Sequence, residues 1–177
     1  MIREALLTPN PYSRPGTPIV KVQAVAMHWV GNPGTSAMAT RNYWETLKDG
    51  SLYASAHYAV DAREIVRAVP ETEIAYHVGP WKDTTPWALE RFGHQTPNNF
   101  CLGVELTHPD WSGAFSEVVL ERARLLVAYL CAHYGLNPLT DIITHNMCTG
   151  KDCPRFWVAH PECLEAFRKS VGRTMEV

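Results

Sequence analysis

The stretch VQAVAMHWV, residues 22–30, decides how the rest of the chain is arranged. It is apolar and partly β-branched, which is typical of a buried central strand. The sequence GNPG follows at residues 31–34 and is a strong loop signal, so the strand ends close to His28. Because open α/β sheets build their sites at strand ends, His28 is the first candidate for a functional side chain.

Further β-like and helical segments follow this strand. Apolar and β-branched runs separated by a polar link predict a hairpin, and one later run holds a single carboxylate, Glu105. Caps and glycines mark the helices. Strands are predicted at residues 55–60, 65–69, 100–107 and 141–144, and helices at residues 117–134 and 161–172. This irregular alternation predicts an α/β fold: a single domain with a mixed central β-sheet flanked by α-helices.

Length and composition favour one globular domain. The 177 residues are 46% hydrophobic and 19% charged, which is ordinary for such a domain. The net charge of −2 and the lack of a basic run argue against a nucleic-acid partner. No apolar run approaches the ~18 residues that would predict a transmembrane segment.

The N-terminal segment has its own character. Residues 1–20 contain four prolines, which favour extended geometry, so we expect an extended N-terminal arm before a domain at residues 21–177. The arm lacks the apolar core of a signal peptide, which predicts synthesis in the cytoplasm without a cleaved signal. Five cysteines with no framework spacing favour free thiols or metal ligands over disulfides.

The stretch HNMCTGKDCP, residues 145–154, is the strongest chemical signal in the chain. Histidine and cysteine are the ligands that zinc prefers, and a catalytic site keeps one position for water. His145 can pair with Cys153 or with Cys148 in a metal loop, and a third ligand must come from elsewhere. His28 is the best candidate; the alternative is a core histidine bonded to a backbone carbonyl.

Five motifs occur in the order found in a known family. They are AMHW (26–29), SAHYAVD (55–61), AYHVG (75–79), NFCLGVEL (99–106), and His145 followed by GKDCP (150–154). With them, the chain resembles the zinc-dependent N-acetylmuramoyl-L-alanine amidases of the type-2 amidase family. This family includes phage endolysins and has fold relatives called peptidoglycan-recognition proteins. The resemblance extends over residues 22–170 and implies a zinc amidase catalytic domain at residues 21–177.

The resemblance implies a role for each matching residue. His28, His145 and Cys153 become the ligands of one catalytic zinc ion, and Cys148 becomes a free thiol near the rim. Glu105 matches the carboxylate that handles the proton of the attacking water. Lys151 matches the lysine that faces the oxyanion; without the resemblance, it would be interpreted as a solvated loop charge.

Three further residues are candidates for substrate binding. His77 is expected to line the groove, and His57 to lie in the cleft or behind the ligands. Trp81, in the irregular segment 80–100, is expected to stack on sugar rings, while it or Trp87 could instead anchor that segment. The remaining histidines are interpreted as surface or helix-end residues: His94, His108, His133 and His160.

The function implied is hydrolysis of the amide bond between the lactyl group of N-acetylmuramic acid and L-alanine in peptidoglycan. The expected protein is a monomeric phage or prophage endolysin that reaches the wall through holin-type release. Three alternatives remain open: a non-catalytic peptidoglycan-binding module, a bacterial autolysin or recycling amidase, and a protein in which zinc is purely structural.

Overall fold

The computed structural model describes residues 2–50 and 52–176, apart from the side chain of residue 81. Within these residues, six strands form one mixed sheet in the order β1-β4-β3-β5-β2-β6. They are β1 (Ile2–Glu4), β2 (Ala24–Trp29), β3 (Tyr58–Val60), β4 (Ile65–Arg67), β5 (Cys101–Leu106) and β6 (Ile142–Thr144). The mixed sheet with flanking helices confirms the predicted fold class.

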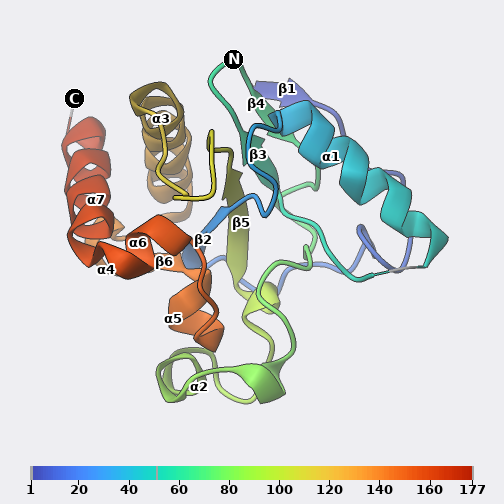
Figure 1. The fold of residues 1–177 in the computed structure, drawn as a ribbon. Helices are drawn as coiled ribbons and strands as arrows, with labels where there is room; N and C mark the ends of the chain where they lie inside the picture. The colour runs from blue at the N-terminus through green and yellow to red at the C-terminus, as the bar shows by residue number, and fades with distance from the viewer. Residues whose placement is uncertain (1, 51, 177) are drawn as a thin grey trace.

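Helices lie on both sides of this sheet (Figure 1). On one side α3 (Glu117–Tyr134) packs against α7 (Pro161–Met175), and on the other α1 (Ala37–Thr46) contacts β3 and β4. The shorter helices are α2 (Pro86–Phe92), α4 (Pro138–Asp141), α5 (His145–Thr149) and α6 (Arg155–Ala159), with 3-10 turns at Leu47–Asp49, Trp81–Asp83 and Pro97–Asn99. No helix in the described part of the chain combines the length and apolarity needed to cross a membrane.

The predicted hairpin is confirmed, although its strands are shorter than expected. β3 pairs antiparallel with β4, whereas β2 pairs parallel with both β5 and β6. The carboxylate of Asp61 closes the hairpin turn by accepting hydrogen bonds from the backbone N–H groups of Arg63 (2.7 Å) and Glu64 (2.8 Å). The strands β6, β2 and β5 therefore run side by side in one direction.

Side-chain alternation gives the two faces of the central strands different characters. Toward α3 and α7, Val25, Met27, Leu102 and Val104 join the largest buried cluster. The residues between them on the opposite face are small: Ala24, Ala26, Cys101 and Gly103. The second face therefore leaves room beside the sheet for other groups.

The predicted long helix is confirmed. The Ser116 hydroxyl accepts a hydrogen bond from the backbone N–H of Val119, and Gly135 ends α3 in a left-handed conformation. The prediction that Gly172 ends the last helix is wrong, because α7 continues to Met175. Gly172 keeps a negative φ, and the neighbouring Val171 is fully buried, so the helix continues through it.

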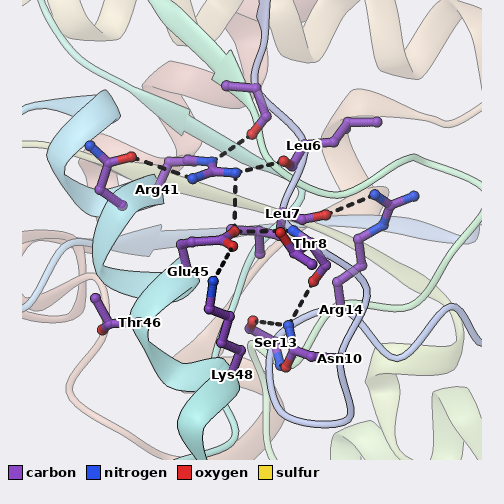
Figure 2. A network of polar contacts seen from close by, with 12 residues as sticks. Leu6, Leu7, Thr8, Asn10, Ser13, Arg14, Arg41, Glu45, Thr46 and Lys48 are labelled. Carbon is purple, nitrogen blue, oxygen red and sulfur yellow. Dashed lines mark hydrogen bonds and ion pairs between the residues drawn. The ribbon is translucent and has the colours of Figure 1, made fainter.

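The N-terminal segment differs from the extended arm expected before the domain: it contributes a strand to the sheet, and it turns back at residues 11–13, where Asn10 bridges Arg14. Its first residues form β1, an edge strand parallel to β4. Beyond β1, polar groups of α1 hold the chain (Figure 2). The Arg41 guanidinium donates to the carbonyls of Ala5 (2.8 Å) and Leu6 (2.6 Å), and the Glu45 carboxylate accepts from the N–H of Thr8 (3.0 Å). The arm thereby fixes α1 against the sheet.

Candidate metal centre and groove

The register of the parallel strands brings the main candidates together. His28 on β2 lies directly opposite Glu105 on β5. On the other side of β2, Met27 lies opposite Thr144, so His145 follows next to His28. The chemistry therefore gathers where β2, β5 and β6 end, as expected for an open α/β sheet.

The ligand atoms of His28, His145 and Cys153 all lie within 4.8 Å of one another. The Sγ atom of Cys153 is 3.7 Å from Nδ1 of His28, and the two imidazole rings are 4.9 Å apart between centroids. Usual zinc–sulfur and zinc–nitrogen bonds at a tetrahedral angle would place two such atoms about 3.6 Å apart. The arrangement fits a small tetrahedral metal ion.

The stretch from His145 to Pro154 is more ordered than the predicted loop. Its first half is the short helix α5, which Thr144 caps by accepting a hydrogen bond from the N–H of Met147. The N–H of Asn146 donates to the carbonyl of Cys153 (2.9 Å), and its side-chain amide donates to the carbonyl of Lys151 (2.9 Å). These bonds hold Cys153 against the helix that carries His145.

Cys148 is not a rim thiol. It is fully buried, packs in the core with Cys101, and lies outside the ligand cluster. The expectation that it sits near the rim is wrong, because α5 turns this side chain toward the sheet while the chain beyond Gly150 returns with Cys153.

Burial favours the neutral forms of Glu105, His145 and Cys153 when no metal is bound. It raises the pKa of Glu105 to about 8, although the nearby Lys151 charge opposes this. Burial also lowers the pKa of His145 to about 4, with Lys151 adding to the effect, and raises the pKa of the Cys153 thiol. Among the described residues, no group hydrogen-bonds to the buried Oε2 atom of Glu105. A divalent cation would supply the missing positive charge and favour the thiolate and the carboxylate.

The centre lies at the bottom of a groove of about 1020 Å³. One wall comes from α1 and the segment after it, and carries the exposed side chains of Tyr43, Leu52 and Tyr53. The other wall carries Lys151 and Arg155. An open groove with aromatic and charged walls suits an extended polar substrate better than a small apolar one.

The residues expected to bind substrate differ in how far they are exposed to the groove. His77 borders the groove but is only 8% exposed, with both ring nitrogens in hydrogen bonds. Of the two places expected for His57, the cleft is contradicted, because the side chain is fully buried and lies behind the groove. Its Nε2 contacts the Glu73 carbonyl (2.9 Å), and its Nδ1 accepts from the N–H of Gly103 (2.9 Å). The side chain of Trp81 lies outside the described residues. Trp87 is partly buried and packs against the core cluster that contains Phe92 and Phe100, and so anchors α2.

One residue near the groove was misjudged from sequence. His108 is buried rather than superficial, and its ring stacks on Trp29 at 4.6 Å between centroids. Arg155 lies over Trp29 from the groove wall, 4.9 Å from the ring centroid. Its position in the sequence could have indicated this, because His108 comes two residues after the end of β5 and His28 one residue before the end of β2.

Comparison with known proteins agrees with this geometry. A family model described as N-acetylmuramoyl-L-alanine amidase (Amidase_2) matches residues 18–156. The chain belongs to this family. Three curated members share 38%, 32% and 34% identity with it: a "Probable N-acetylmuramoyl-L-alanine amidase" of Bacillus licheniformis, BlyA of Bacillus subtilis (strain 168), and CwlL of Bacillus licheniformis. The matches cover 92%, 94% and 92% of this amidase-family chain but only 44%, 45% and 44% of those proteins, so the chain spans less than half their length.

Solved structures share the fold of this family member. A mutant endolysin from Bacillus subtilis superimposes with a TM-score of 0.74 at 22% identity, over 95% of this chain and 98% of that one. The PlyG catalytic domain gives a TM-score of 0.76 at 21% identity, over 99% and 95% of the two chains. At these identities the likeness concerns the fold alone.

Proposed function

We propose that this domain hydrolyses the amide bond between the lactyl group of N-acetylmuramic acid and L-alanine in peptidoglycan, with zinc held by His28, His145 and Cys153. The observation that carries the proposal is a three-ligand cluster in an open groove, beside the half-buried Glu105, whose buried Oε2 atom has no hydrogen-bond partner among the described residues. Family membership supports the same bond. Zinc, when bound there, would supply a Lewis acid and lower the pKa of a water molecule to about 7.

The protein's own residues would carry the proton and the charge. Glu105 accepts a proton from the attacking water molecule while the oxygen of that water bonds to the lactyl carbonyl carbon. It then donates that proton to the alanine nitrogen as the C–N bond breaks, leaving a lactyl carboxyl group and a free amine. The Lys151 ammonium group stabilises the negative charge that develops on the carbonyl oxygen. A divalent cation at the cluster would counteract the effect of burial on the pKa of Glu105 and so leave the carboxylate ionised and able to accept the proton.

The test is digestion of purified peptidoglycan followed by mass spectrometry. The proposal predicts new stem peptides with a free N-terminal alanine and intact glycan strands. Cys153→Ser should abolish this release while keeping affinity for muropeptides. A wild-type protein that binds muropeptides without releasing such stem peptides would instead be a non-catalytic binding module. Cleavage of glycan or of peptide cross-links would assign a different bond.

We further propose that the physiological role is lysis from within the cell after holin-type release. The fold, shared with a mutant endolysin from Bacillus subtilis, is compatible with this role, and a holin experiment separates it from that of an autolysin or recycling amidase. Expression in a susceptible host with and without a pore-forming holin tests it. Lysis that depends on the holin supports an endolysin, whereas lysis without it contradicts this route.

A further inference from the structure

A chain of three groups leads away from His28 into the sheet. The Nε2 atom of His28 lies 3.0 Å from Nδ1 of His77, and the two rings meet edge to face at 90°. The Nε2 atom of His77 in turn lies 3.1 Å from the backbone carbonyl oxygen of Cys101. All three groups are buried.

The carbonyl at the end of this chain decides where the protons are. The Cys101 oxygen can only accept, so Nε2 of His77 must carry a hydrogen and donate it. In a neutral ring, Nδ1 of His77 then has a free lone pair and accepts from Nε2–H of His28. His28 is left with its lone pair on Nδ1, the atom 3.7 Å from the Cys153 sulfur and the one that faces the metal centre.

The position of the His77 ring depends on a glycine. A Cβ atom at Gly103, in the middle of β5, would lie 2.6 Å from Cγ of His77 and 2.9 Å from its Nδ1. Glycine weakens a strand interior, and close approach of another group is a common reason for finding it there. Asn98 holds the His77 segment from the other side, because its Oδ1 accepts from the N–H groups of His77 (3.1 Å) and Val78 (3.0 Å).

We infer that His77 is a positioning residue for the metal centre: it accepts the Nε2 proton of His28 and thereby aims the His28 Nδ1 lone pair at the metal, and Gly103 provides the space for its ring. This role replaces the substrate contact predicted for His77, whose two ring nitrogens already have partners within the fold. Partners of this kind fix the tautomer and orientation of a ligand, and their loss costs roughly 10- to 100-fold in metal affinity. The inference rests on the zinc site of the proposed function.

The test is the dissociation constant for zinc, measured by competition with a chromophoric chelator. His77→Leu removes the acceptor and should weaken zinc binding about 10- to 100-fold. His77→Asn keeps an oxygen near the place of Nδ1 and should recover most of that loss. Gly103→Ala brings no metal-binding atom, yet it should weaken zinc binding because its methyl group displaces the His77 ring. With cobalt in place of zinc, His77→Leu should also change the visible absorption of the bound ion.

The matched control is His57→Leu. His57 is equally buried and lies edge-on to His77 at 5.8 Å between centroids, but it has no bond to His28. Its loss should lower thermal stability without weakening zinc binding. The inference about His77 would be overturned, and the proposed function left standing, if His77→Leu and Gly103→Ala both bound zinc as tightly as the wild type. An equal loss of zinc affinity in His57→Leu would have the same consequence. Failure of the wild-type protein to bind zinc would overturn the proposed function with it.

Discussion

Replacing Glu105 with glutamine is expected to stabilise the metal-free protein at neutral pH and to remove its activity. Burial raises the pKa of Glu105 to about 8 from its usual value of 4.5. The unfolded chain therefore releases this proton at lower pH than the folded protein does. The stability present below pH 4.5 is lost progressively as the pH rises from 4.5 to 8.

The magnitude follows from the pKa difference. At pH 7, about 2.5 pH units above the pKa in the unfolded chain, Glu105 is ionised in the unfolded chain but still protonated in the folded protein. This difference lowers the free energy of unfolding by about 3 kcal/mol. At pH 5 the same effect is below ~1 kcal/mol. The side chain borders the groove, so solvent reduces the effect and these values are upper bounds. Glu105→Gln lacks the titration, so its advantage over the wild type should grow by about 2 kcal/mol between pH 5 and pH 7.

The assay is urea unfolding of both proteins in chelator at the two pH values, with release of stem peptides measured on the zinc-loaded forms. The loss of a general acid–base group should lower turnover by roughly 10²- to 10⁴-fold. Asp152→Asn, at an exposed carboxylate on the same groove, is the control and should change neither quantity much. A stability difference independent of pH would refute the desolvated carboxylate, and turnover within tenfold of wild type would refute its role in proton transfer.

Four further outcomes are expected. Chelation by EDTA or phenanthroline should abolish lysis of cell walls, zinc should restore it, and free zinc at 100 times its dissociation constant should raise the free energy of unfolding by about 2.7 kcal/mol. Lys151→Met should lower turnover about 10²- to 10³-fold with zinc affinity retained, because the side chain stabilises charge on the substrate. Tyr43→Ala should raise KM for muropeptides with little change in thermal stability, since this groove residue is 53% exposed. Burial lowers the pKa of His57 to about 4, so the metal-free protein should lose up to ~3 kcal/mol of stability as the pH falls from 6.5 to 4, and His57→Leu should lack this part of the loss in acid unfolding.

The strands that lead to the site residues could be predicted from local sequence. β2 and β5 are apolar runs bounded by turn signals, and His28 and Glu105 stand close to the ends of these runs. His145 directly follows a third such run. Because the carboxyl ends of parallel strands lie at one edge of the sheet, the residues at these ends are expected to lie close together.

The roles of the remaining histidines could not be predicted in this way. His57 and His77 each occupy a short polar interval between apolar residues, so local sequence does not separate them. Their tertiary contacts distinguish them, because His57 contacts Glu73 and Gly103, whereas His77 contacts His28. His108 and Cys148 were misjudged for the same reason, since their burial depends on Trp29 and Cys101, which are far away along the chain.

The two faces of the central strands have different roles: one packs into the hydrophobic core, and the other carries the residues of the site. Val25, Met27, Leu102 and Val104 are fully buried against α3 and α7, and side chains of this size contribute roughly 1.5–3 kcal/mol each on burial. On the other face, small residues such as Gly103 leave space beside the sheet for imidazole rings, and those of His57 and His77 reach backbone groups that let them stay neutral.

Glu105 is the exception on that face, because its buried oxygen has no partner among the described residues. Fold stability does not explain a carboxylate kept there, since its desolvation destabilises the protein at neutral pH. A cation at the His28–His145–Cys153 cluster would relieve this cost. Truncating Val104 should therefore act mainly on stability, whereas adding a methyl group at Gly103, one residue away on the opposite face, should act mainly on metal affinity.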